Sequence, residues 1–468
     1  MANKVVHILR YGTVAEKAHL EKAISAYDYL SINGNTAAYV STAIAKFIVD
    51  KFFSNQDRGF FIDPITYAFQ KEIHLLKSKS KITGETKIKK SVEKLIEIYQ
   101  YPVNKVKDDI SVSVADFSDI QIVTEFCKRT LDFQYSIVHD HIEKNDLCKY
   151  LEYITDEDFR HLCQLRPKFL IAPYFYLDLQ DSNFDKWLNI NCQFVDVAKE
   201  QSEIDFSNLD IYAQIVISKN VLYDANAIQK IAAAYSRTNC DGITIWVDNL
   251  NEHEATIYEL QGLINLLKAL PQKPIYNMYG GYFSILLTNK SIGLLEGVSH
   301  GLEYGESRSV YPVGGGIPVS KYYYLPLHQR LDFTKAFYLL EHIKALDTTL
   351  ENWGTPDKYY EEICKCSQCK AVIKREMINF IEFESKEFYE VHRKNQTLRR
   401  KKASSETKKN CLYHYLLCKK IEFIRVKNQP ISNLLQDLMI QKNAYKSSDA
   451  IQETELDYLE NWISALNH

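Results

Sequence analysis

The sequence predicts an α/β fold, a TIM-type (β/α)8 barrel followed by a zinc-binding helical C-terminal region. Two observations carry this prediction. From about residue 31 to about residue 326, short apolar runs alternate with amphipathic segments, which is the pattern of parallel strands joined by helices. Further along, Cys364, Cys366 and Cys369 fall within six residues, a spacing that lets three thiolates converge on one metal ion.

The candidate strands are short and apolar. They are YLSI near Tyr29, GFFID ending at Asp63, KFLIAPYFYL, AQIVIS, DGITIWVD, PIYNMYGG and, less clearly, GLEYGESR. The clearest helix starts at Ala225, where the apolar residues of ANAIQKIAAAYSRT recur every three or four positions. A barrel places its functional residues at the carboxyl ends of its strands, and those ends carry Asp63, Asp178, Asp248, Gly280, Gly281 and Glu306.

After Pro326 the sequence changes to long helical patterns without strands. The segment from Leu331 has an apolar stripe, the chain from Lys370 is highly charged, and amphipathic patterns follow from Ile431. We therefore predict a barrel domain over 1–330, a zinc-binding and basic helical region over 331–428, and C-terminal helices over 429–468.

Composition describes a large protein with a substantial core. Of the 468 residues 46% are hydrophobic, and 57 Lys and Arg residues against 60 Asp and Glu residues give a net charge of −3. No run of about 18 apolar residues occurs, and the N-terminus lacks the apolar core of a signal peptide. We expect a cytoplasmic protein with no membrane partner, in which the ten cysteines are reduced.

Positive charge is concentrated in two segments. Residues 393–409 hold eight Lys or Arg residues and one Glu, a local charge of +7, and residues 77–90 hold six Lys and one Glu, a local charge of +5. Such clusters favour a polyanion, so nucleic acid is the expected partner, although solvated surface segments would look the same. The candidate nucleic-acid-binding residues are Arg393, Lys394, Arg399, Arg400, Lys401 and Lys402.

The cysteine cluster needs one more ligand for tetrahedral zinc. Two downstream histidines qualify, His392 and His414, and both are predicted to lie in helices. A closed site of three cysteines and one histidine would be structural, because a catalytic zinc keeps one coordination position open.

The Cys364-Lys-Cys366-Ser-Gln-Cys369 motif, followed by a helical histidine, resembles the zinc site of the tRNA-guanine transglycosylase superfamily (queuine and archaeosine tRNA-ribosyltransferases). FIDPITYAFQ is similar to the family's TDSGGFQ-like turn, and GLEYGESRSVYP is similar to its GIDMFDCVLPTR segment. CLYHYLLCKKIEFIR resembles its histidine-bearing helix, which favours His414 over His392.

This resemblance implies a pentosyltransferase with a structural Zn²⁺ that replaces guanine in a nucleic acid with a 7-deazaguanine base. Glu306 would be the nucleophile and Asp63 would transfer protons. From their own chemistry, Asp178 and Asp248 could pair with the N–H groups of guanine, and Gly280 and Gly281 could let the backbone approach the base, although Asp248 could equally cap a helix. The family's paired glycines are absent, so the chain looks more like the DNA-guanine transglycosylases, and DNA is favoured over tRNA. A non-catalytic member that binds nucleic acid or a partner is the alternative. A homodimer or a modification or defence complex would also fit the resemblance.

Overall fold

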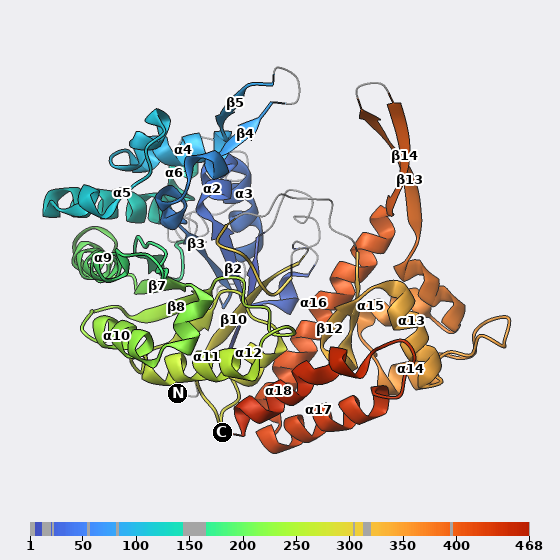
Figure 1. Cartoon of the computed structure of the whole chain (residues 1–468). Helices are drawn as coiled ribbons and strands as arrows, with labels where there is room; N and C mark the ends of the chain where they lie inside the picture. The colour runs from blue at the N-terminus through green and yellow to red at the C-terminus, as the bar shows by residue number, and fades with distance from the viewer. Residues whose placement is uncertain are drawn as a thin grey trace.

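Eight parallel strands form a nearly closed barrel in the computed structural model (Figure 1). The structure describes residues 5–11, 20, 23–53, 57–80, 84–143, 165–302, 305–311, 320–393 and 396–467. The strands follow one another around the barrel in chain order, and they are β1 (Val6–Arg10), β2 (Tyr29–Asn33), β3 (Gly59–Asp63), β6 (Leu170–Ile171), β7 (Ile211–Ile217), β8 (Gly242–Val247), β9 (Ile275–Asn277) and β10 (Gly297–Gly301). β10 pairs with β1, so the last strand lies beside the first. Between β3 and β6, the Lys168 N–H donates to the carbonyl oxygen of Phe60 at 2.8 Å.

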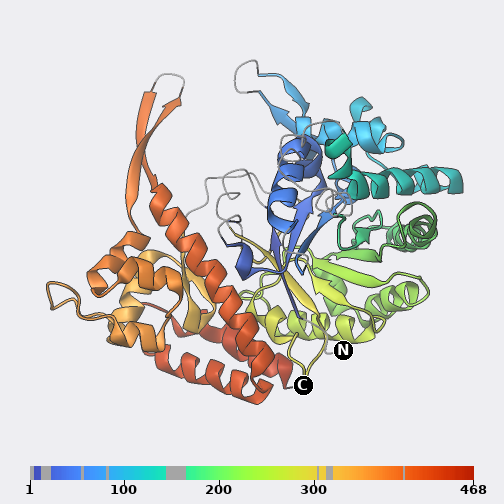
Figure 2. The ribbon, with the colours of Figure 1, turned by 180° about the vertical axis from the view of Figure 1, so that it is seen from behind.

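Helices cover the outside of this barrel (Figure 2). They are α2 (Gly34–Tyr39), α3 (Ser41–Phe52), α4 (Lys90–Tyr99), α5 (Ile120–Ser136), α6 (His139–Glu143), α9 (Phe184–Asp205), α10 (Ala225–Tyr235), α11 (Ile257–Ala269) and α12 (Tyr282–Leu286). The predicted helix at Ala225 is confirmed as α10. It begins where the carboxylate of Asp224 accepts hydrogen bonds from the backbone N–H groups of Asn226 and Ala227.

Aromatic side chains fill the barrel interior. Successive side chains of a strand face opposite sides of a sheet, so alternate residues point inward and form a buried cluster separate from the one under the helices. In it the ring centroids of Phe169 and Tyr212 are 3.9 Å apart, and those of Trp246 and Tyr279 are 4.7 Å apart. The barrel is therefore a packed core, and ligand chemistry belongs at its carboxyl end.

The C-terminal region packs against one side of the barrel. It contains a short hairpin of β11 (Tyr322–Tyr324) and β12 (Gln329–Leu331), a long hairpin of β13 (Lys386–Arg393) and β14 (Gln396–Ala403), and the helices α13 (Phe333–His342), α14 (Asp357–Glu362), α15 (Ser367–Ile373), α16 (Ser405–Asn428), α17 (Ile431–Tyr445) and α18 (Asp457–Leu466). Hydrogen bonds attach it to the barrel; among them, Asn289 Nδ2 donates to the carbonyl oxygen of Val426 at 2.7 Å, and Trp462 Nε1 donates to that of Glu252 at 2.9 Å.

Several sequence predictions are corrected. β1 was not predicted, and the last barrel strand is GVSHG at Gly297–Gly301, whereas residues 305–308 of GLEYGESR form no strand. KFLIAPYFYL contributes only the two residues of β6 and an isolated bridge from Leu177 to Ile217. Glycine, serine and histidine in β10 break the apolar run that marks the other strands, which is why its pattern is hard to recognise.

The prediction of a helical 331–428 region is wrong for residues 386–403, which form the β13–β14 hairpin, and His392 lies on β13. Aromatic and β-branched residues such as Phe388 and Val391 favour strands, but the surrounding charges obscure that signal in the sequence. Among the residues that the structure describes, no helix is long and apolar enough to cross a membrane.

Candidate functional site

Asp63 is the buried carboxylate at the end of β3. Its Oδ1 accepts hydrogen bonds from the Tyr174 hydroxyl at 2.5 Å and from the Ile65 N–H at 3.0 Å. The second bond is a turn contact of the kind an Asp before proline commonly makes. Burial raises the pKa of Asp63, while the Tyr174 and Ile65 hydrogen bonds and the charge of Arg308 oppose that rise. Asp63 is therefore placed to carry a proton at a strand end.

Two arginines that the sequence analysis did not select lie beside Asp63. Arg10 ends β1 and Arg308 follows β10, and both donate to the hydroxyl of Tyr279, with Arg308 Nη1 at 3.1 Å. The carbonyl oxygen of Arg308 accepts from Trp246 Nε1 at 3.1 Å. Residues 305–311 thus fold over the carboxyl end of the barrel and bring positive charge to it.

Asp248 and Asp178 lie in the same end of the barrel, around Lys71. Asp248 accepts hydrogen bonds from the Tyr176 hydroxyl at 3.1 Å and the Val310 N–H at 2.7 Å. Asp178 Oδ1 accepts from the backbone N–H of Gln180 at 3.1 Å. Both carboxylates raise the pKa of Lys71, but burial outweighs them and lowers it to about 7.

Lys71 itself was missed by the sequence analysis. Its ammonium lies 3.4 Å from the ring centroid of Tyr311 and donates no hydrogen bond within the described parts of the chain. Its position one residue after the FIDPITYAFQ turn was visible in the sequence, but nothing marked it as buried.

Glu306 lies in a different setting, against helix α16. Its Oε1 is 2.6 Å from Lys419 Nζ and accepts a hydrogen bond from the Tyr415 hydroxyl at 3.0 Å. Lys419 is fully buried and also contacts Glu422 at 3.0 Å. Asp63 and Glu306 thus take their hydrogen bonds from different groups, although Glu306 and Arg308 belong to one segment at the barrel end.

Gly280 and Gly281 make room for this arrangement. A Cβ on Gly281 would lie 2.6 Å from Glu306 Oε2 and 2.7 Å from Glu252 Oε2, and one on Gly280 would lie 2.6 Å from Ser284. Glu252 accepts hydrogen bonds from Ser284 Oγ at 2.5 Å and the Phe283 N–H at 2.9 Å. Gly281 thus allows two carboxylates to approach the backbone closely, a role the sequence analysis did not assign to it.

Helix α16 continues the polar network with Glu422. Its Oε1 accepts hydrogen bonds from the Tyr323 hydroxyl and His328 Nδ1, each at 2.6 Å. Burial would raise the pKa of Glu422, but Lys419 and His328 overcome it and hold that pKa below its usual range. Lys419 and Glu422 are buried, and the half-buried Glu306 completes a carboxylate–ammonium–carboxylate set with them.

The three predicted cysteines and His414 form a buried cluster. The ligand atoms of Cys364, Cys366, Cys369 and His414 all lie within 4.8 Å of one another. His414 Nδ1 is 3.2 Å from Cys369 Sγ, and His414 Nε2 is 2.7 Å from the carbonyl oxygen of Tyr323. Since the carbonyl can only accept, Nε2 carries the proton and Nδ1 is left for a metal. The donor types, their separation and the hydrogen bond to Tyr323 all fit a tetrahedral ion.

Cys418 is a further thiol beside this cluster that the sequence analysis did not select. Its Sγ lies 3.7 Å from Cys364 Sγ and 3.6 Å from His414 Nδ1. The signal was present in the sequence, because residues four apart on a helix share one face and Cys418 follows His414 by four. His392, the alternative ligand, is instead paired with Thr397 in the β13–β14 register.

The predicted nucleic-acid-binding residues fall on the β13–β14 hairpin. Arg399 and Lys401 lie over the ring of Phe388, at 4.0 and 5.1 Å from its centroid, and Lys402 pairs with Glu387 at 2.8 Å. Arg393 and Arg400 occupy positions on the two strands, whereas Lys394 lies outside the described residues. The hairpin carries its positive charge away from the barrel wall (Figure 1).

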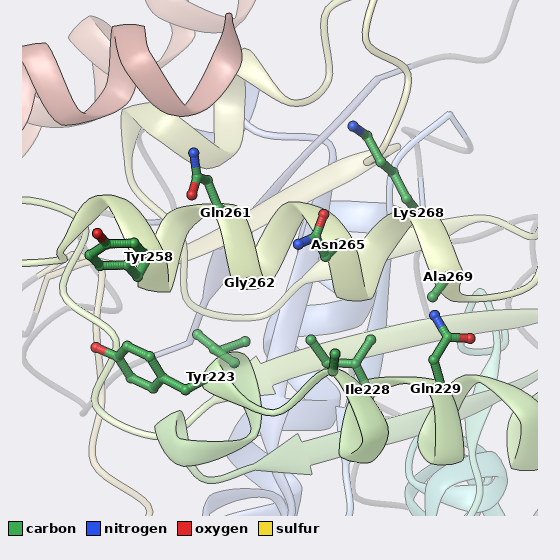
Figure 3. A pocket seen from close by; sticks show the side chains of 11 residues that line it. Tyr223, Ile228, Gln229, Tyr258, Gln261, Gly262, Asn265, Lys268 and Ala269 are labelled. Carbon is green, nitrogen blue, oxygen red and sulfur yellow. The ribbon is translucent and has the colours of Figure 1, made fainter. Parts of the chain in front are cut away.

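A surface groove of about 560 Å³ lies elsewhere, on the outer helical layer between α10 and α11 (Figure 3). Its lining includes Tyr223, Tyr258, Gln261 and Lys268. Gly262 lines the groove and lets α11 approach the backbone of Leu222 closely, since a Cβ on Gly262 would lie 2.1 Å from the carbonyl oxygen of Leu222. The groove lacks carboxylates and lies outside the barrel, so we assign it no part in the chemistry at the strand ends.

Comparison of the chain with protein-family models and with curated proteins gives no match. The resemblance to the transglycosylases therefore remains a hypothesis that depends on the residues of this chain alone.

Proposed function

We propose that this chain is a divergent TIM-type member of the tRNA-guanine transglycosylase superfamily that exchanges guanine in DNA for a 7-deazaguanine base. The observation that carries the proposal is a buried Cys3His cluster joined, through helix α16, to a carboxylate at the carboxyl end of a parallel barrel. In this proposal the cluster holds a structural Zn²⁺.

The two carboxylates would divide the chemistry as in a retaining glycosidase. The Glu306 carboxylate attacks C1′ of the sugar, the bond from C1′ to guanine N9 breaks, and guanine leaves with the electron pair. Asp63 donates a proton to the departing base, which its raised pKa favours. The incoming 7-deazaguanine then gives its N9 proton to Asp63 and attacks C1′, which releases Glu306.

The surroundings support these roles. Lys419 and Tyr415 hold the Glu306 carboxylate in one orientation, and Arg10 and Arg308 supply positive charge beside Asp63. Asp248 and Asp178 remain candidates for contacts with the N–H groups of the base. The basic β13–β14 hairpin would contact the phosphate backbone and contribute affinity, whereas base choice would come from the barrel end.

A second candidate is a non-catalytic protein of the same fold that binds nucleic acid. It is favoured by the hydrogen bonds among Arg308, Tyr279 and Trp246, which close the barrel end, and by the ion pair that already occupies Glu306. A tRNA substrate is the third possibility.

Incorporation of labelled 7-cyano-7-deazaguanine into duplex DNA and into tRNA separates the three. We expect incorporation into DNA, reduced by about 100-fold or more in Asp63→Asn and Glu306→Gln, since each removes a group with a direct role. Glu254→Gln, an exposed carboxylate, is the matched control and should leave the rate unchanged. Incorporation only into tRNA would identify tRNA, and not DNA, as the substrate. Binding of DNA with no incorporation into either polymer would favour the non-catalytic protein.

A further inference from the structure

Two basic hairpins rise from the same end of the molecule. One is β4 (Lys77–Lys79) with β5 (Thr86–Ile88), which follows β3 and so stands at the carboxyl end of the barrel, and the other is β13 with β14. Both views show them pointing the same way beyond the body, on opposite sides of the space above the strand ends (Figures 1 and 2). We propose that these hairpins are two arms that grip the backbone of a double-stranded nucleic acid.

The charge of the chain is divided in a way that suits this partner. Residues 77–90 and residues 386–403 carry a net charge of +5 each, which leaves −13 for the rest of the protein. An acidic body repels phosphates, so a polyanion would be held at the arms and directed between them.

The first arm is anchored at its base and exposed toward its tip. Lys77 pairs with Asp109, and Lys89 Nζ donates to the carbonyl oxygen of Leu75 at 2.8 Å, so these two lysines serve the fold. Lys79 and Lys87 are exposed on the hairpin strands, and Lys90, the first residue of α4 beside the base of the hairpin, is exposed too. Lys87 contacts the exposed Glu85 at 2.9 Å, a pairing of little strength in water. These three lysines are the phosphate contacts we assign to the arm.

The second arm has the dimensions of a groove-binding ribbon. Each of its strands has eight residues, so it extends for about 27 Å at about 3.4 Å per residue. A two-stranded ribbon is only marginally stable alone in water. In this one the side chain of Phe388 is 53% exposed, and Arg399 and Lys401 lie over its ring. The major groove of a duplex, about 12 Å wide, admits such a ribbon, and its phosphates would flank the cations.

This inference depends on the proposed function only in taking nucleic acid as the partner, and it can be tested without base exchange. The probe is a labelled DNA duplex of about 30 base pairs, with its dissociation constant measured by fluorescence anisotropy between about 50 and 200 mM salt. No deazaguanine is present, so a failure of the base-exchange chemistry leaves this measurement unaffected.

Three variants with equal charge loss are compared with the wild-type chain. The first-arm variant combines Lys79→Gln, Lys87→Gln and Lys90→Gln, the second-arm variant combines Arg399→Gln, Lys401→Gln and Lys402→Gln, and the control combines Lys290→Gln, Lys427→Gln and Lys446→Gln at exposed sites off the arms. The substituted side chains are all at the surface, so melting temperatures should stay unchanged, and circular dichroism checks this.

Each arm variant should reduce the slope of log K against log salt by about 2.7, since each phosphate contact contributes about 0.9, and both sets together should reduce it by about 5. The control should keep the wild-type slope. A first-arm variant with an unchanged slope would refute the two-arm grip even if the second arm binds. Equal affinity for a single strand, or equally strong binding of an acidic polypeptide, would refute the duplex as the partner.

Discussion

Replacing Lys419 with methionine should destabilise the protein strongly. Lys419 is fully buried, and its ammonium contacts Glu306 at 2.6 Å and Glu422 at 3.0 Å. Methionine is similar in volume, so the change removes the charge and leaves little cavity. The buried Glu422 and the half-buried Glu306 would then lack their cation, and removal of one partner from a buried ion pair costs about 3–5 kcal/mol.

The assay is urea unfolding at pH 7, followed by intrinsic fluorescence. Lys427→Met is the matched control, because Lys427 is on the same helix but exposed. Its free energy of unfolding should differ from that of the wild type by no more than about 0.5 kcal/mol. The double variant Lys419→Met with Glu422→Gln should recover part of the loss, since the amide oxygen can still accept from Tyr323 and His328. A loss below about 1 kcal/mol for Lys419→Met would refute the view that this set is a buried, paired network.

The pH dependence of that loss has a definite sign. The pKa of Glu422 in the folded wild-type protein is lowered, so its contribution to stability is present above its unfolded pKa and disappears as the pH falls. Without Lys419 the buried carboxylate would favour protonation, so the variant gains stability relative to the wild type as the pH falls. The difference in free energy of unfolding between the wild-type protein and Lys419→Met should therefore become smaller as the pH falls from 7 toward 4.

Three further predictions concern the Cys3His cluster and the other carboxylates. Cys366→Ser should lose bound zinc, measured by mass spectrometry after desalting, and should unfold at a lower urea concentration. The control Cys192→Ser, outside the cluster, should retain its zinc. An unchanged zinc content in Cys366→Ser would contradict the assignment. Tyr174→Phe removes a hydrogen bond that lowers the pKa of Asp63, so the pH profile of base exchange should move toward higher pH, and an unmoved profile would separate Asp63 from the proton transfer. Burial raises the pKa of Glu252 to about 7, so between about pH 4.5 and 7 the folded state binds more protons than the unfolded state. The free energy of unfolding should therefore fall as the pH rises through this range, by at most about 3 kcal/mol. In urea titrations, Glu252→Gln should flatten this pH dependence.

The parts of the fold that the sequence predicted are those with strong local patterns. GFFID, AQIVIS and DGITIWVD are continuous apolar runs, because strands of a parallel barrel are buried on both faces. β1 and β10 escaped notice since His7, Ser299 and His300 interrupt their apolar pattern, yet all three side chains are buried. His7 and His300 bring their Nε2 atoms to 2.6 Å, a contact across 293 residues that no local pattern reveals.

The site divides in the same way. The cysteines could be found because three ligands lie within six residues, whereas Arg10 and Tyr279 meet across 269 positions and Glu306 meets Lys419 only through the packing of α16 on the barrel. Long-range pairs of this kind depend on tertiary structure, which periodicity and residue spacing do not determine.

Helix α16 joins what the sequence showed separately. His414 and Cys418 are one turn apart and face the cysteine cluster, while Tyr415, Lys419 and Glu422 are spaced by four and three residues and face the barrel network. An α-helix is rigid over two turns, so the position of the cluster fixes the position of Lys419, and Lys419 contacts Glu306 directly. The Cys3His cluster is therefore coupled to the barrel end through one helix, so it helps to orient the carboxylate that we propose as the nucleophile.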